Sequence, residues 1–377
     1  MADAEPNQTV IEPPGSAIVV GPNRAVARIH IRTALAMLAA VVVACAAVDF
    51  CAHSRRVAEW LDARALISYK RYNRAYNHTR NYGDPFEFLM LDELPKADYS
   101  KGGVYVLGSS NVMFCADFAD LAPEQARLIH DYGFPGASPA EIFQFVRFLV
   151  ENEGFLTAGP GKTEVLLSLC ENDLLEAGPW GPGAGGYFPP YLNASGFYHY
   201  DPTGGISVVP MSPVERFFKL RKNRWRSFLQ RCGRMLERTA HSPVDMQTRR
   251  VEAMRYGASD DWSAHPPPQL KELARLLDYL KAKGVKVQFL MVPSGHWNDG
   301  VPLHENFVAA IPPLCAARGI PLLDYSRLLS DDEFMDAHHA SYKGALKLHD
   351  AMVRLALEHL YQTGALPPDT RKESHGQ

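Results

Sequence analysis

Cysteine is scarce in this sequence, and charge of either sign is nearly balanced. The 377 residues include six cysteines, none of which falls in a CxxC motif or another paired metal-ligand spacing. This absence argues against a zinc site and a thiol redox centre, so we expect no metal and buried free thiols, with pairing in an oxidising compartment left open. The formal net charge of −3 lacks the basic excess of nucleic-acid-binding domains, and no nucleic-acid partner is expected.

The sequence also lacks internal repeats and the HExxH motif of zinc peptidases, which gives no support to a repeat architecture or to a zinc hydrolase. With 46% hydrophobic residues over this length, the chain can bury a large core as one main domain that carries attachments. His296 and His304 could line a pocket, but in the absence of a metal motif they are interpreted as ordinary loop histidines.

Long hydrophobic runs are absent except for one near the N-terminus, after a polar stretch at 1–32 that is expected to be a disordered tail. Apolar residues fill 34–48 without interruption, and the segment 33–52 reaches the roughly 20 residues that span a bilayer. A buried helix of a soluble domain is the plain alternative. The Ala- and Val-rich composition favours a transmembrane anchor or an export signal, with lipoprotein cleavage at Cys45 or ordinary cleavage near Ala47 as variants.

The charges that flank this run do not agree with an export orientation. Arg24, Arg28 and Arg32 precede it, but a larger number of basic residues follows it, beginning with Arg55 and Arg56. Taken alone, the positive-inside rule favours a cytoplasmic location for the rest of the chain.

Five apolar runs of β type alternate with helical patterns through the remainder of the sequence. Such alternation predicts an α/β fold, namely a three-layer α/β/α domain with a five-stranded parallel sheet. The expected strands are Val104–Leu107, Arg127–Asp131, Glu164–Leu169, Val285–Met291 and Ile320–Asp324.

Candidate catalytic and binding residues follow four of these runs. Ser110 comes after the first run, Gly136 lies in a glycine turn after the second, and Asn172 ends the third. Asp336 and His339 stand three residues apart after the last one. A Gly-Ser-Ser turn is common and says little by itself. Because ligands bind beyond the carboxyl ends of parallel strands, however, we expect all these residues to meet in one crevice.

A serine, a glycine amide, an asparagine and an Asp/His pair are the groups that acyl transfer requires. The Ser110 hydroxyl is a weak nucleophile at neutral pH unless an imidazole removes its proton, a role that fits His339. Asp336 would fix the tautomer of that imidazole and stabilise its cation. The Ser110 amide, the Gly136 amide and the Asn172 side chain would bind the negative oxygen of the tetrahedral intermediate as an oxyanion hole. This chemistry needs no cofactor.

These blocks resemble those of the SGNH hydrolase superfamily, also called GDSL esterases. Gly108-Ser109-Ser110 is similar to the first block, with Ser109 in place of the usual aspartate, and Gly136 corresponds to the second block. The resemblance covers roughly residues 100–362. It implies a flavodoxin-like sheet and a serine esterase or acyltransferase.

The third and fourth blocks complete the resemblance. Asn172 and the aspartate after it match the third block, although Cys170 stands where a glycine is usual and puts the loop shape in question. Asp336 and His339, with Gly344 five residues further on, match the fourth block. The Asp-x-x-His spacing selects His339 as the base over the histidine before it.

An insertion at 176–268 separates the third and fourth strands. It opens with a glycine- and proline-rich loop at 178–190, expected near the crevice, where Trp180 and Tyr187 either contact sugar rings or pack on the domain. A basic amphipathic helix is expected at 213–238. Two interpretations of it are equally supported: a solvated face above a core stripe, or contact with anionic lipid headgroups or an anionic polymer.

The resemblance carries an expectation of function. Anchored proteins of this kind are similar to polysaccharide O-acetyltransferases or deacetylases, and to the D-alanine-transfer proteins of teichoic acid pathways, whose serine block also reads Gly-Ser-Ser. We therefore expect an O-acyltransferase of cell-envelope polysaccharide, anchored in the inner membrane with its catalytic domain outside the cytoplasm, and a membrane-bound acyl-donor protein as partner. An esterase or deacetylase, or a non-catalytic glycan-binding or assembly protein, are the alternatives. Outside the catalytic domain, a juxtamembrane helix and linker are expected at 53–99 and a disordered tail at 363–377.

Overall fold

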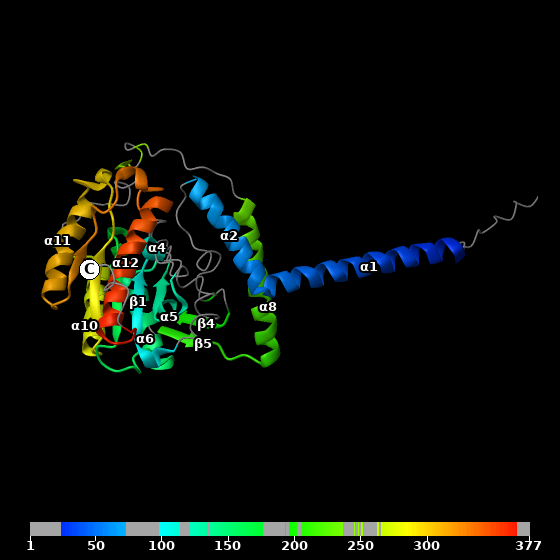
Figure 1. Ribbon diagram of the computed structural model, residues 1–377, viewed down its shortest axis with the longest axis horizontal. Helices are drawn as coiled ribbons and strands as arrows, with labels where there is room; N and C mark the ends of the chain where they lie inside the picture. The colour runs from blue at the N-terminus through cyan, green and yellow to red at the C-terminus, as the bar shows by residue number, and fades with distance from the viewer. Residues whose placement is uncertain are drawn as a thin grey trace, which may run out of the picture. The chain divides into compact units, whose positions relative to one another are not determined.

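In the computed structural model the chain divides into two compact units, Met1–Cys51 and Ala52–Gln377 (Figure 1). The glycine- and proline-rich loop expected at 178–190 lies outside the described residues. The structure describes residues 24–72, 98–113, 121–134, 136–175, 193, 196–201, 205–236, 245, 248, 250, 251, 262, 263 and 265–367.

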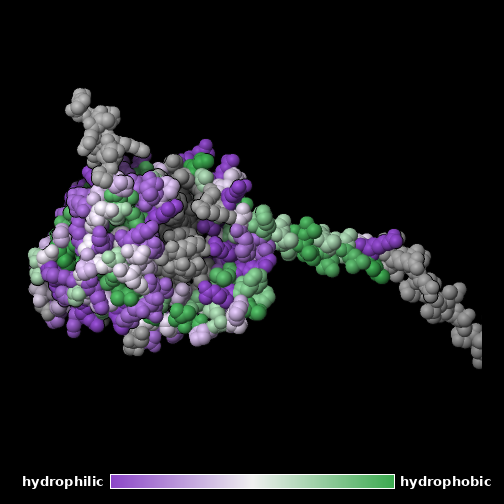
Figure 2. Space-filling view, turned by 60° about the horizontal axis from the view of Figure 1, so that its bottom comes forward, coloured by the Kyte–Doolittle hydropathy of each residue, from purple (hydrophilic) through white to green (hydrophobic). Residues whose placement is uncertain are grey.

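A long apolar helix, α1 (Arg24–His53), dominates the first unit. Its segment His30–His53 contains an 18-residue window with a mean hydropathy of 2.4 and is long and apolar enough to cross a bilayer. Figure 2 shows this segment as a continuous run of hydrophobic residues. The helix starts at Arg24, which corrects the boundary of the tail expected at 1–32. The alanines and arginines at 24–32 are good helix formers, and a helix already nucleated by the apolar run extends through them.

A five-stranded parallel sheet lies at the centre of the second unit. Its strands are β1 (Gly103–Gly108), β2 (Ile129–Gly133), β3 (Thr163–Leu169), β6 (Lys286–Met291) and β7 (Leu322–Asp324). They run in the order β2-β1-β3-β6-β7, and every adjacent pair is parallel. The predicted fold class and all five predicted strands are confirmed, with shifts of up to two residues at the strand ends.

Helices must cover both faces of this sheet, because β1 and β3 are buried along their whole length. The main ones are α6 (Pro139–Asn152), α10 (Pro268–Ala282), α11 (Pro302–Ala316) and α12 (Tyr342–Gln362). Right-handed crossovers put α6, α10 and α11 on one face and leave the other to α12. In agreement, α6 packs against α10, and α12 packs against β1.

The chain changes direction across the sheet at β1, and this brings three strand ends together. From β1 the chain moves outward to β2 and then crosses back to β3 on the other side of β1. Gly108 pairs with Gly133 of β2 and with Ser168 of β3. A side chain at Gly108 would collide with the carbonyl oxygen of Ser168, so this close approach requires glycine. Such a switch point is where open α/β sheets bind their ligands.

The described part of the insertion forms a hairpin and a helix outside the main sheet. Strands β4 (Tyr198–Asp201) and β5 (Gly205–Val208) are antiparallel, and β5 packs on α6. The helix α8 (Pro213–Leu236), predicted at 213–238, packs against α2 (Arg55–Tyr72), which follows α1 in the chain. Figure 1 shows α2 and α8 side by side.

The folded domain extends past residue 362, where it was expected to end. Leu366 is buried, and its backbone N–H donates to the carbonyl oxygen of Leu360 at 3.1 Å. This leucine closes the end of α12 over the core, so residues 363–367, expected to belong to the tail, are part of the folded domain.

Helix α6 begins with a reciprocal capping box that buries a carboxylate. The Ser138 N–H donates to Oε2 of Glu141 at 2.8 Å, and the Glu141 N–H donates to the Ser138 hydroxyl at 3.4 Å. Burial raises the pKa of Glu141 to about 7 against the opposing effect of the Ser138 hydrogen bonds, and the charge of Asp173 acts in the same direction as burial.

This raised pKa predicts that Glu141 weakens the fold as the pH rises. The folded chain holds the Glu141 proton up to about pH 7, whereas the unfolded chain releases it near its ordinary value, so the free energy of unfolding falls between these limits. Glu141→Gln keeps an acceptor for Ser138 but cannot ionise. We expect the difference in the free energy of unfolding between the variant and wild type to rise by about 2 kcal/mol in favour of the variant from pH 5 to pH 8, as measured by urea unfolding. A constant difference across that range would contradict the assignment.

Candidate active site

Ser110 occupies the turn between a strand and a helix at the switch point. It is the first residue of the short helix α4 (Ser110–Met113), which starts two residues after β1 ends at Gly108. Its side chain is half-buried, and its Oγ lies 2.8 Å from Nε2 of His339. The two residues are 229 positions apart in the chain, so the fold brings them together.

Asp336 holds both the loop that carries His339 and the ring of His339 itself. Its Oδ1 accepts the backbone N–H groups of His338 at 2.8 Å and of His339 at 2.7 Å. Its Oδ2 lies 2.7 Å from Nδ1 of His339. Burial alone would raise the pKa of Asp336, but the hydrogen bond and charge of His339 and these backbone amides hold it well below its usual range. The carboxylate is therefore ionised at neutral pH.

This arrangement determines the direction of the hydrogen bonds. An ionised Asp336 can only accept, so Nδ1 of His339 carries the proton and Nε2 of the neutral ring is the acceptor. The Ser110 hydroxyl then donates to Nε2. A serine, an imidazole and a carboxylate linked in this order can remove the serine proton during nucleophilic attack and stabilise the resulting imidazolium.

Gly136 and Asn172 follow the two strands that flank β1. Gly136 has a φ of 62°, a left-handed conformation that favours glycine, and it comes after β2. The chain leaves β2 along β1, since the Phe134 N–H donates to the Gly108 carbonyl oxygen at 2.8 Å. Asn172 lies in the 3₁₀ turn η5 (Glu171–Leu174), directly after β3. Both residues therefore lie at the carboxyl end of the sheet, on either side of the strand that carries Ser110.

The Asn172 side chain contacts His338, a contact that the sequence analysis did not anticipate. Its Nδ2 lies 3.1 Å from the ring nitrogens of His338, and its Oδ1 is buried without a hydrogen-bond partner. An amide nitrogen carries two N–H groups. One of them can be held by His338 while the second stays available to another acceptor.

Cys170, which stands where the resemblance has a glycine, does not disturb this turn. Its φ is −109° and its ψ is 172°, extended values that any residue adopts. The Cys170 N–H donates to Oδ2 of Asp173 at 2.8 Å and closes the turn that presents Asn172. Burial raises the pKa of Asp173 to about 6 and that of the Cys170 thiol well above its ordinary value.

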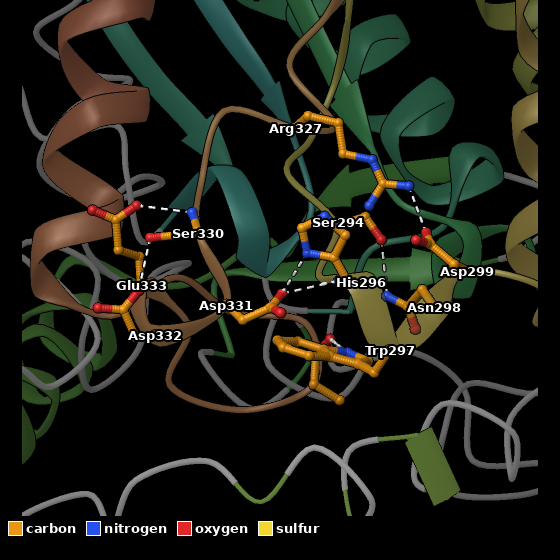
Figure 3. Close-up of polar contacts among 11 residues, drawn as sticks. Ser294, His296, Trp297, Asn298, Asp299, Arg327, Ser330, Asp331, Asp332 and Glu333 are labelled. Atoms are coloured by element: carbon orange, nitrogen blue, oxygen red, sulfur yellow. Dashed lines mark hydrogen bonds and ion pairs between the residues drawn. The ribbon is translucent and has the colours of Figure 1, made fainter.

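A tryptophan with no motif around it supports the loop of Asp336 and His339. Trp297 lies in the 3₁₀ turn η6 (His296–Asn298) after β6, and its indole N–H donates to the carbonyl oxygen of Ala337 at 3.1 Å (Figure 3). Its buried ring meets Phe334 edge to face, with centroids 5.1 Å apart. These contacts fix the loop from the side of β6. Because Ala337 is 40 residues away in the sequence, no local pattern marked Trp297.

Further contacts join the segment after β6 to the segment after β7. Oδ1 of Asp331 accepts the backbone N–H of His296 at 3.0 Å and also contacts its Nδ1 at 3.1 Å (Figure 3). Arg327 forms an ion pair with Asp299 at 2.5 Å. His296 is therefore an exposed surface residue whose side chain pairs with Asp331.

Glu333 holds the opposite end of the same loop. Its carbonyl oxygen accepts the Ser341 N–H at 2.7 Å, and its carboxylate accepts the Ser330 N–H at 3.0 Å and pairs with Lys347 at 2.6 Å. A side chain at Gly344 would collide with the Glu333 carbonyl oxygen. The glycine of the fourth block is thus explained by the close approach of α12 to this loop.

His304 is not a loop residue, contrary to the interpretation from the sequence. It lies in the first turn of α11, is buried, and places Nδ1 3.5 Å from Oε1 of Glu171. Burial alone would raise the pKa of Glu171, but the interaction with His304 lowers it. The pair ties α11 to η5 at the residue next to Asn172. Among the described residues, no group of three His, Cys, Asp or Glu side chains is arranged to hold a metal ion.

No protein-family model and no curated protein matches the sequence. Among solved structures, a candidate acylhydrolase from Bacteroides fragilis aligns with a TM-score of 0.36 and 13% identity, over 71% of this chain and 92% of that one. Protein YxiM from Bacillus subtilis aligns with a TM-score of 0.30 and 12% identity, over 70% of this chain and 57% of its own. These values are too low to support a conclusion about this protein, so the candidate site is identified from its own geometry.

The support from Trp297 predicts a measurable effect on Ser110. Trp297→Phe keeps an aromatic ring against Phe334 but removes the hydrogen bond to Ala337, so the His339 loop should shift by a fraction of an ångström. Because misplacement of a reacting group by about 1 Å can cost 10²-fold, we expect labelling of Ser110 by a fluorophosphonate to slow on the order of tenfold. Trp262→Phe, which alters another buried indole, is the matched control and should label at the wild-type rate. Equal rates for all three proteins would show that Trp297 is only a packing residue.

Proposed function

We propose that the protein is a serine enzyme that acts on esters through an acyl-Ser110 intermediate. The single observation that carries this proposal is the hydrogen-bonded chain from Ser110 Oγ through His339 to Asp336, with distances of 2.8 and 2.7 Å. Ser110 attacks the ester carbonyl while His339 takes its proton. His339 then gives the proton to the departing alkoxide, and an acyl-Ser110 ester and a free alcohol result.

We propose that the negative oxygen of the tetrahedral intermediate is bound by the Ser110 amide, the Gly136 amide and the Asn172 side chain. The position of these residues after the three adjacent strands supports this role, because amides at strand ends and helix starts point out of the sheet toward a ligand. The second N–H of the Asn172 amide would donate to the oxyanion while His338 holds the first.

The acyl-enzyme mechanism predicts that Ser110→Ala, His339→Ala and Asp336→Asn each lower kcat for a short-chain aryl ester by on the order of 10³-fold or more. The losses should not add in double variants, because the three groups act as one proton-transfer unit. Circular dichroism and melting temperature should stay close to those of wild type.

Matched controls exist on the hairpin, where Ser207→Ala and His199→Ala change an exposed serine and an exposed histidine and should leave turnover unchanged. Near-normal turnover by Ser110→Ala would overturn the nucleophile assignment. Asn172→Ala should cost on the order of 10² to 10³-fold in kcat, and an unchanged rate would leave Asn172 a structural residue.

We further propose that the acyl group, most simply acetyl, is passed to a hydroxyl of a cell-envelope polysaccharide, from a membrane-bound acyl-donor protein. This step is the first reaction reversed with a different alcohol: the sugar hydroxyl attacks the acyl-Ser110 carbonyl, and His339 removes its proton. The apolar helix α1 and the resemblance of the four blocks to anchored acyltransferases support this proposal. Water in place of the sugar gives an esterase or deacetylase, and the half-buried, solvent-reachable Ser110 supports that alternative.

Transfer and hydrolysis predict different fates of the acyl-enzyme. A transferase must place an acceptor hydroxyl at the acyl carbonyl, where positioning is worth effective molarities of roughly 10⁵ M or more, and its acyl-enzyme should persist in water alone. After loading with p-nitrophenyl acetate, we expect acetyl-Ser110 to disappear faster with an acceptor glycan than without one, and acetylated sugar to form, as followed by mass spectrometry. If acetate is released equally fast in both conditions and no sugar is acylated across neutral and anionic glycans, the protein is an esterase.

We propose that α1 anchors the chain in the inner membrane with the catalytic domain outside the cytoplasm. The length and hydropathy of α1 support membrane insertion. The location of the catalytic domain outside the cytoplasm is supported only by the proposed envelope substrate, since the flanking arginines favour a cytoplasmic location. Alkaline phosphatase fused after Gln377 should be active in cells, and green fluorescent protein at the same position should be dark. The reverse pattern would remove the envelope polysaccharide as substrate.

A further inference from the structure

Part of the polar side of helix α8 lies against the rest of the protein. Asn223 is buried. One turn earlier Lys219 donates from Nζ to the Gly196 carbonyl oxygen at 3.0 Å, and Arg216 lies over the ring of Phe197 at 5.7 Å. Two charged side chains of α8 therefore contact the chain just before β4. A helix that covers a hydrophobic core normally presents its apolar side to that core.

The apolar stripe of α8 is consequently exposed at the start of the helix. Val214, Phe217 and Phe218 are 65%, 54% and 63% exposed. On a helix, residues three and four apart lie on one face, so these three side chains form a single patch. Among the described residues, none of α8 belongs to the buried core of the domain. The interpretation of this stripe as core packing is thus not supported, and an exposed patch of large apolar side chains marks an interaction surface.

Helix α2, which packs on α8, has a similar exposed side. Among its described side chains, Leu61 and Ala65 are buried, whereas Trp60 and Ile67 are 51% and 56% exposed. Arg64 lies over the Trp60 ring at 5.6 Å. Exposed tryptophan beside arginine is typical of segments at a membrane–water interface.

The chain itself brings this pair of helices to a bilayer. The candidate span ends at His53, and after Ser54 alone α2 begins at Arg55. If α1 crosses a membrane, the first turn of α2 therefore lies close to its surface, and α8 packs on α2. Basic side chains lie around the apolar ones, as binding to an anionic surface requires. Among the described side chains of α2 and α8, the exposed basic ones are Arg56, Arg64, Arg71, Arg216, Arg221, Lys222 and Arg224.

We infer that α8 is an interfacial helix, whose residues Val214, Phe217 and Phe218 enter the boundary between headgroups and acyl chains of an anionic phospholipid bilayer. The basic residues bind the lipid phosphates, and the apolar patch is removed from water. The catalytic domain is then held against the membrane at a second point besides α1. The inference rests on the proposed insertion of α1 and is independent of the proposed catalysis.

The test places a photoreactive group in the patch of the full chain. Phe218→p-benzoylphenylalanine is reconstituted into nanodiscs of phosphatidylcholine with phosphatidylglycerol and irradiated, and adducts are identified by mass spectrometry. The matched control is Asp350→p-benzoylphenylalanine, an exposed position on α12. We expect phospholipid adducts at least tenfold more abundant at position 218 than at position 350.

The charge requirement is tested in the same assay. Lys222→Glu in the photoreactive chain should reduce lipid adducts several-fold in anionic nanodiscs, whereas Lys271→Glu, an equal charge change on α10, should not. Adducts at position 218 with a second copy of the chain, or equal lipid labelling at positions 218 and 350, would overturn the inference. If the chain does not enter nanodiscs at all, the anchor and this inference fail together, while ester turnover remains a separate measurement.

Discussion

The carboxylate of Asp336 is the group on which the candidate site depends. One of its oxygens accepts two consecutive backbone amides, and the other accepts the imidazole proton of His339. The same ion therefore fixes the shape of the loop and the tautomer of the ring. Had only the ring been held, a small rotation of the loop would still move Nε2 away from Ser110. Because both are fixed from one point, the distance between Ser110 and His339 is determined by where the loop sits on the sheet.

The position of that loop comes from three different parts of the fold. Trp297 after β6 holds Ala337, and Glu333 holds the start of α12 through Ser341 and through the close approach of Gly344. On the other side, the register of β1 with β2 and β3 places Ser110 at the point where the sheet changes direction. A site assembled from distant segments does not require each segment to have a strong conformational preference. It depends instead on the sheet remaining in register, since a shift of one residue in β1 would invert the side chains at its end.

The sequence predicted the parts of the structure that local physics controls. Buried strands are read from apolar runs such as Val104–Leu107, and the residues beyond their ends follow from the geometry of parallel sheets. Contacts between distant segments produce no comparable pattern in the sequence. Trp297 with Ala337, His304 with Glu171 and Asn172 with His338 became visible only in three dimensions, because each pair is set by how two strands are ordered in the sheet.

Helix α8 shows why hydrophobic periodicity alone could not decide between a core helix and a membrane helix. A protein core and the acyl region of a bilayer are both apolar, so the same stripe of Val214, Phe217 and Phe218 satisfies either one. The polar side of the helix makes the distinction, since desolvating a charged or amide group is costly unless it finds a partner. In α8, Lys219 donates to the Gly196 carbonyl oxygen, and Asn223 is buried. The partner of a polar residue therefore shows which side of a helix faces the protein, and this information is absent from the hydrophobic pattern alone.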